Sequence, residues 1–337
     1  LETDKQFELL KNYSDELILT NKGAFSGPYK LKERKEDSEF QLAKWRTDAL
    51  DSANPPKDIF FFKTKSTGSE LAKAGQTDCL DYETLENDVT SSLENSGWVS
   101  SPSELTGETF VILNPKYVPL EVRRYLYLQT NAKELVRMLG VPKFAPAFGL
   151  IPKGYPGELT ESDVAVLQNE KFEYKGPKVS FKLDYEPTSE MSTKTAQWLK
   201  KMWSTDRIEV VLNPVEKGPK LERMFKKLAE ATVGRKGMDY PDGVSVLTYF
   251  KGQYQYNYFH VEDKKIDHAI AQSLQEMDLA KRTKNYKEIQ KMILRHYTNI
   301  PLLFGSQASG MWSPKVKRVP SHPMGTHTMP FEMIEVK

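Results

Sequence analysis

The chain has 337 residues, of which 39% are hydrophobic and 28% are charged, and its formal net charge is +2. This length and apolar content allow a substantial core and predict about two domains. Lysine and arginine are balanced by acidic residues without a long basic block, which argues against nucleic-acid binding. No apolar run reaches the roughly 18 residues that a membrane-spanning helix needs. The single cysteine, Cys79, excludes an internal disulfide.

Hydrophobic periodicity predicts the helices and strands in chain order. The expected helices cover residues 5–19, 119–139, 196–202, 219–231, 264–280 and 282–297. The expected strands cover residues 39–42, 59–62, 109–113, 179–183, 208–212, 318–319 and 332–336. A strand, a helix and a strand follow one another between residues 179 and 212, which predicts a βαβ unit. The sequence therefore predicts an α/β fold.

Catalytic and metal-binding patterns are absent from the sequence. It contains no G-x-S-x-G, H-E-x-x-H or G-x-G-x-x-G motif and no P-loop. The five histidines lack the spacing of metal ligands. Acidic residues are spread over predicted helix surfaces, where they serve solvation and pairing. We therefore expect a protein that is not an enzyme and that holds no metal and no cofactor.

Aromatic residues are densely clustered between positions 249 and 259. The members of this cluster are Tyr249, Phe250, Tyr254, Tyr256, Tyr258 and Phe259. The cluster fits a segment that packs onto the core. It equally fits a ligand cleft, because aromatic side chains give large contact area with little loss of rotamer entropy. The sequence leaves both interpretations open.

Three segments carry a first resemblance to a known family. Ser26–Leu31, followed by Lys44-Trp45, resembles a "TGPYKL…W" signature. Pro119–Leu126 is similar to a "DVRVRQAL" helix, with Leu120-Glu121 in place of Asn-Asp. Ala145–Pro152 resembles a "PA…G.IPPG" loop. These signatures are those of the extracellular solute-binding proteins of family 5, which bind oligopeptides, dipeptides or nickel for ABC importers.

Two further segments strengthen this resemblance. Gly237–Asp242 is similar to the family's "W.ADYPDP" loop, and Asn257 and Asp267 fall where the family continues the pattern. Arg282, Tyr286–Gln290 and Ile300–Leu302 resemble the ending "R…LY.E.Q…..IPL". The order and spacing of all these segments extend over nearly the whole chain. On this basis the chain is identified as resembling the C-terminal portion of a family 5 protein.

The resemblance implies an α/β fold of the periplasmic binding protein type (type II, peptide-binding class), with mixed sheets flanked by helices and two lobes that close over a ligand. Lobe one would comprise residues 1–113 and 310–337, and lobe two residues 114–309, with the hinge near Asn114 and Gly310. The N-terminal part of lobe one would precede residue 1. The C-terminal segment 332–336 would return to elements before residue 113.

The resemblance also implies a function and a site. A monomer in the periplasm, or a lipoprotein at the cell surface, would capture a peptide or similar solute and pass it to an ABC permease. Asp239 would pair with the α-ammonium group of the peptide. The alternative is that Asp239 belongs only to a turn that caps a helix.

Four neighbouring residues complete the expected ligand-binding set. The backbone of Gly237 and Met238 would run alongside the ligand. Arg235 would face a ligand carboxylate, and Tyr240 is a further contact.

Two departures from the family pattern bear on the ligand. Lys236 replaces the usual tryptophan, and Gly243 replaces the last proline. Both are expected on the ligand side, so the pocket and the class of ligand would differ from the peptide-binding prototypes. Two other functions stay open at this point. The chain could be the ligand-sensing domain of a bacterial transcription regulator, or an enzyme with an unrecognised site.

Overall fold

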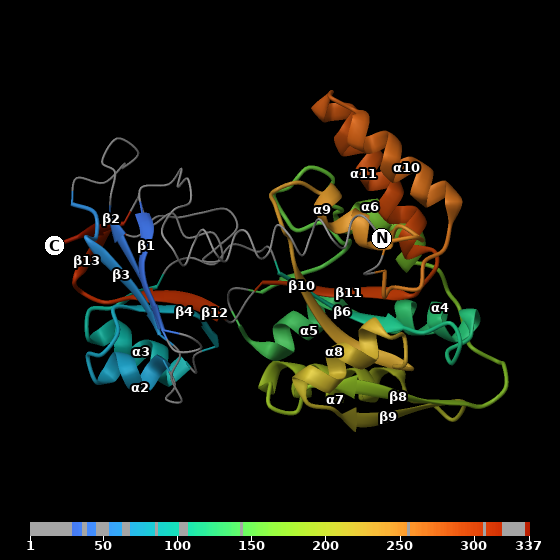
Figure 1. Cartoon of the computed structure of the whole chain (residues 1–337). Helices are drawn as coiled ribbons and strands as arrows, with labels where there is room; N and C mark the ends of the chain where they lie inside the picture. The colour runs from blue at the N-terminus through green and yellow to red at the C-terminus, as the bar shows by residue number, and fades with distance from the viewer. Residues whose placement is uncertain are drawn as a thin grey trace. The chain divides into compact units, whose positions relative to one another are not determined.

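The computed structural model places most of the chain in two compact units. Unit 1 comprises residues 1–103 and 308–337, and unit 2 comprises residues 104–307. The structure describes residues 29–35, 39–44, 54–62, 68–84, 87–100, 107–141, 144–254, 257–305, 308–318 and 334–337. The predicted helix 5–19, the segment 26–28, Trp45 and Tyr256 lie outside these ranges. In Figure 1 the described residues are coloured from blue near the N-terminus to red at the C-terminus.

The described part of unit 1 contains small antiparallel sheets and two short helices. Its strands are β1 (Tyr29–Lys35), β2 (Glu39–Lys44), β3 (Asp58–Phe62), β4 (Cys79–Thr84), β5 (Val99–Ser100), β12 (Ala308–Trp312), β13 (Val316–Arg318) and β14 (Glu335–Val336). They pair in the orders β1-β2-β3, β4-β12-β5 and β13-β14. The helices are α2 (Gly68–Lys73) and α3 (Asn87–Asn95).

The C-terminal strand returns to the first part of the chain. The amide of Val336 donates to the carbonyl oxygen of Asn54 at 2.9 Å, and the side-chain amide of Asn54 donates back to the Val336 carbonyl oxygen at 2.9 Å. These bonds confirm the expectation that the C-terminal segment packs on elements before residue 113.

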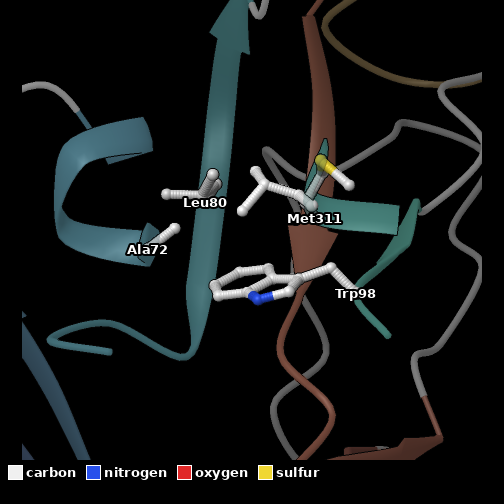
Figure 2. Packing of buried hydrophobic residues seen from close by; sticks show 5 residues of the cluster. Ala72, Leu80, Trp98 and Met311 are labelled. Atoms are coloured by element: carbon white, nitrogen blue, oxygen red, sulfur yellow. The ribbon is translucent and has the colours of Figure 1, made fainter. Parts of the chain in front are cut away.

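A small hydrophobic core in unit 1 joins the β4-β12-β5 sheet to helices α2 and α3 (Figure 2). Leu80 on β4 and Met311 on β12 are register partners, so their side chains lie on the same face of the sheet. Both are buried, and Ala72, Leu93 and Trp98 complete the cluster. Burying a side chain of leucine or methionine size stabilises a fold by about 1.5–3 kcal/mol. This core ties the late strand β12 to the early strand β4.

Unit 2 is built on a mixed sheet. Among the described residues its strands are β6 (Gly107–Leu113), β7 (Ala145–Pro146), β8 (Val179–Tyr185), β9 (Ile208–Pro214), β10 (Ala231–Gly237) and β11 (Asn299–Phe304). The order is β7-β11-β6-β10-β8-β9. Strand β6 is antiparallel to β10 and β11, whereas β8 is parallel to β9 and β10. Strand β6 is buried along its whole length, as its central position requires.

Helices pack around this sheet (Figure 1). They are α4 (Leu120–Gln129), α5 (Ala132–Leu139), α6 (Glu161–Gln168), α7 (Glu190–Trp203), α8 (Lys217–Phe225), α9 (Val244–Leu247), the 3₁₀ helix η1 (Thr248–Phe250), α10 (Lys264–Gln275) and α11 (Leu279–Leu294). Helix α7 contacts both β8 and β9, which confirms the predicted βαβ unit. Helices α10 and α11 lie side by side as a hairpin.

The observed helices differ in extent from the predicted ones, and for two of the predicted helices the local cause is clear. The segment expected as one helix, 119–139, forms α4 and α5, because the Asn131 side chain accepts a hydrogen bond from the amide of Glu134 and starts a new helix. The helix expected at 219–231 stops at Phe225. Lys227 has a φ of 56°, in the left-handed region, which ends the helix and lets β10 begin at Ala231.

The compact units differ in their bounds from the predicted lobes. Strand β6, expected in lobe one, lies in the middle of the unit 2 sheet. Asn114, expected at the hinge, is buried inside unit 2. Its side-chain amide donates to the carbonyl oxygens of Lys227 at 3.1 Å and Ala229 at 3.0 Å. The boundaries between the units fall instead at 103/104 and 307/308.

Candidate functional site

The predicted site residues lie where β10 ends and the chain enters α9. Strand β10 presents Arg235 and Gly237 at the surface, and the following loop exposes Asp239 and Tyr240. The side chain of Met238 is buried, at 7% exposure. A Cβ added to Gly237 would have no atom within 4 Å, so its backbone faces open space. Of the five residues, four are therefore accessible and Met238 is available only through its backbone.

Asp239 is held in a defined orientation by its neighbours. The hydroxyl of Tyr249 donates to Asp239 Oδ2 at 2.9 Å, and the amide of Asp239 donates to Ser245 Oγ at 2.9 Å. Both partners lie further along the chain, in η1 and α9. The loop thus folds back on the helix that follows it and keeps the carboxylate at the surface.

Asp242 anchors the same loop to α11. Its Oδ1 accepts from the hydroxyl of Tyr286 at 2.7 Å and from the amide of Val244 at 3.0 Å, at the start of α9. Arg282 approaches Oδ2 at 3.4 Å. Burial raises the pKa of the Tyr286 hydroxyl, and its hydrogen bond to Asp242 adds to this shift. The spacing of Arg282 and Tyr286 in the sequence pattern therefore has a structural reason, because both residues fix the loop that carries Asp239.

Gln290, one turn further along α11, fixes a second loop. Its Oε1 accepts from the amides of Leu150 at 2.8 Å and Ile151 at 3.0 Å, while its Nε2 donates to the carbonyl oxygen of Gly157 at 2.6 Å. The side chain is fully buried. The proline- and glycine-rich segment before α6 is therefore attached to the same helix as the Asp239 loop.

Gly243 packs closely against the proline- and glycine-rich loop. A Cβ at this position would lie 2.6 Å from Ile151 Cδ1 and 2.8 Å from the carbonyl oxygen of Pro156. Contacts this short leave no space for a side chain. This close packing explains why glycine stands here in place of proline.

The described residues of the aromatic cluster divide between the buried core and contacts to the Asp239 loop. Phe250 stacks on Phe259 with ring centroids 4.2 Å apart, and Phe110 of β6 lies 5.2 Å from Phe259. These rings are buried and form core. Tyr249 lies 5.4 Å from Tyr254 and contacts Asp239 through its hydroxyl, so it belongs to the site.

The two polar residues expected after the Asp239 loop support the aromatic segment. Asn257 is buried, and its side-chain amide donates to the carbonyl oxygens of Lys251 at 3.0 Å and Val261 at 2.7 Å. Asp267 accepts from the amide of Gly252 at 2.8 Å. These bonds hold the segment that connects η1 and α10.

An unusual pair of charged residues lies next to the site. Lys236 on β10 and Glu108 on β6 are direct register partners, so their side chains project from the same face of the sheet. The ammonium of Lys236 lies 3.3 Å from the centroid of the Tyr249 ring. Burial lowers the pKa of Lys236 to about 7, and Glu108 and Asp239 oppose this effect. Burial raises the pKa of Glu108 well above its ordinary value, with Lys236 opposing.

In the sequence, Lys236 stands out only as a departure from the family pattern, and no local pattern marks Glu108 or Ser245. The pairing of β6 with β10 joins residues more than a hundred positions apart, which periodicity does not reveal. In the part of the chain that the structure describes, no group of three or more metal-ligating side chains comes together. Within the same ranges, no helix combines the length and the apolar character that crossing a bilayer requires.

Comparisons with known proteins identify the fold. No protein-family model matches the chain, and no curated protein matches it. Several solved structures, however, do match the chain. The chain is similar to the Escherichia coli murein tripeptide binding protein MppA, with a TM-score of 0.67 at 17% identity over 92% of this chain and 64% of MppA. It thus spans less than two thirds of the length of MppA.

Two further structures show the same similarity. A dipeptide-binding protein from Pseudoalteromonas sp. SM9913, in complex with Met-Leu, gives a TM-score of 0.72 at 16% identity over 97% of this chain and 69% of that protein. NikA from Brucella suis, in complex with Fe(III)-EDTA, gives 0.66 at 19% identity over 92% and 68%. The predicted fold is confirmed as that of the peptide-binding class of periplasmic solute-binding proteins. The structural neighbours are consistently proteins of the family that the sequence motifs resemble.

Proposed function

We propose that this protein is the solute-binding component of an ABC importer, which captures a peptide or similar small solute and delivers it to a permease. The observation that carries the proposal is the Asp239 loop. An exposed carboxylate is oriented by Tyr249, and its loop is anchored to α11 through Asp242. A rigid acceptor of this kind on a solute-binding fold suits recognition of a cationic group.

The proposed ligand contact is an ion pair between Asp239 and the α-ammonium group of a peptide. Pairing in a site closed to water gives a charge-assisted hydrogen bond that fixes the register of the ligand. The open backbone at Gly237 suits strand-like contacts to an extended ligand, and the exposed ring of Tyr240 offers apolar area. Arg235 is the candidate partner for a ligand carboxylate.

The remaining parts of the proposal follow from the family resemblance. We expect a monomer that works in the periplasm or as a lipoprotein at the cell surface, without catalysis and without a cofactor. The neighbouring structures are named for binding a murein tripeptide and a dipeptide, which supports a short peptide as the ligand of this chain.

The test is calorimetric titration of the purified protein with a pool of synthetic di- and tripeptides. Loss of one member of a desolvated charge pair costs about 2–5 kcal/mol, so Asp239→Asn is expected to weaken binding by roughly 30-fold or more. Asp206→Asn is the matched control, because this aspartate is exposed on another loop. Full affinity in the Asp239→Asn variant would show that Asp239 is only a turn residue.

A further inference from the structure

Lys236 places a positive charge of the protein itself near the carboxylate of Asp239, the residue proposed to bind the ligand. Its ammonium lies 3.3 Å from the centroid of the Tyr249 ring and 3.5 Å from the carbonyl oxygen of Val246. The hydroxyl at the other end of the same ring donates to Asp239 at 2.9 Å. One tyrosine therefore joins the ammonium and the carboxylate.

The groups that face Lys236 come from all the elements packed around it. Glu108 lies opposite on β6, Asp239 on the loop, and Tyr249 in η1. The pKa of Tyr258, beside Glu108, is raised by burial, so this hydroxyl stays neutral. Burial also raises the pKa of Glu108, which disfavours its charged form. Of the two carboxylates that act on this ammonium, Asp239 is the exposed one.

We propose that Lys236 sets the charge selectivity of the Asp239 site, because its ammonium competes with a ligand ammonium for the field of the Asp239 carboxylate. This inference rests on the proposed function and names a determinant of its specificity. While Lys236 is protonated, a free amine at Asp239 meets a second positive charge nearby. A ligand whose end is acylated brings no charge and meets no such repulsion.

The protonation state of Lys236 makes this selectivity depend on pH. Because the pKa of Lys236 is lowered to about 7 by burial, against Glu108 and Asp239, the ammonium is charged in mildly acidic solution and largely neutral above pH 8. Repulsion between the Lys236 ammonium and a ligand ammonium bound at Asp239 is expected to change the affinity by roughly tenfold. Binding of a cationic ligand also favours release of the Lys236 proton.

The first experiment measures the affinity of trialanine and of N-acetyl-trialanine for the wild type and for Lys236→Met at pH 5.5 and pH 8. Lys236→Met is expected to bind trialanine roughly tenfold more tightly than the wild type at pH 5.5 and about equally at pH 8. The acetylated peptide should bind both proteins alike at both pH values. Because both proteins meet the same peptide at the same pH, the ionisation of the peptide affects both affinities equally and does not change their ratio.

Lys220→Met is the matched control. Burial lowers the pKa of Lys220 as well, but this lysine pairs with Glu186, and the charges that act on it are those of Glu186, Asp184 and Lys217. The control is expected to leave the ratio of the two peptide affinities at its wild-type value. If Lys236→Met also leaves that ratio unchanged at pH 5.5, the inference is overturned.

A second experiment needs no ligand and separates this inference from the proposed function. The pKa of Lys236 is measured by NMR of ¹³C-labelled lysine in the wild type and in Asp239→Asn. Since Asp239 favours the charged ammonium, its removal is expected to lower the pKa of Lys236 further. An unchanged pKa would contradict the coupling and overturn the inference even if peptides bind. If the pKa falls but neither protein binds peptide, the coupling stands and the proposed ligand class is wrong.

Discussion

Replacement of Gln290 by leucine tests how the loops around the site are held. The wild-type side chain accepts from two buried amides and donates to the carbonyl oxygen of Gly157. Leucine has a similar size but no polar atoms, so three backbone groups would lose their partner. Each buried group left without a hydrogen bond costs about 1–3 kcal/mol. With some gain from the added apolar burial, we expect Gln290→Leu to lower the free energy of unfolding by about 3–5 kcal/mol.

The assay is urea unfolding of the whole chain followed by far-UV circular dichroism. Gln272→Leu is the matched control, because Gln272 is exposed on α10. Exposed substitutions of this kind change the free energy of unfolding by about 0.5 kcal/mol or less. A loss below about 1 kcal/mol for Gln290→Leu would refute the reasoning, since the backbone amides would then have found other acceptors at little cost.

Three further substitutions test the same region. Gly243→Ala adds a methyl group where no space exists, and should destabilise the protein by about 1–3 kcal/mol in the urea assay. Tyr286→Phe removes the hydroxyl that donates to Asp242, and should cost about 1.5–3 kcal/mol in the same assay. Burial raises the pKa of Asp163, but hydrogen bonds from Thr160 and other donors outweigh this and hold it at about 2, below the ordinary 3.8. Its contribution to stability is therefore complete above the ordinary pKa and is lost as the pH falls from about 4 to 2, and Asp163→Asn should lack this loss in thermal melts across that range.

Local patterns predicted strands β6, β8 and β9 of the sheet in unit 2, but not β7, β10 or β11. The alternation in β8 and β9 and the helix between them predicted the parallel pair, because short-range periodicity decides this unit. Strand β11 was missed as a strand. It contains Pro301, which usually argues against an internal strand, yet it lies between β7 and β6. The register shift between Pro301 and Leu303 accommodates the proline.

The division of the chain into units was harder to predict. Strand β6 could be recognised as a strand, but its partners β10 and β11 come from much later in the sequence. Pairing over such separations depends on the packing of the whole unit, which no local pattern reports. The compact units divide at 103/104, ahead of this strand, whereas the predicted lobe boundary follows the strand.

The candidate site was predicted in part. The motif around Asp239 located the loop, and the pattern of Arg282 and Tyr286 located the helix that holds it. The roles of Tyr249 and Lys236 depend on contacts across η1 and β10, so the sequence showed only an aromatic cluster and a departure from the family pattern. Gly243, read as a second departure on the ligand side, proved to be a close packing contact.

The most direct test of the central claim compares one peptide with and without its charge at the amino end. Trialanine and N-acetyl-trialanine are titrated separately into the wild-type protein at pH 7.5 by calorimetry. If Asp239 pairs with the ligand ammonium, trialanine is expected to bind at least roughly 30-fold more tightly, because acetylation removes the charged partner of a desolvated carboxylate. Equal binding of the two peptides would contradict the claim that a peptide ammonium is the group recognised at Asp239.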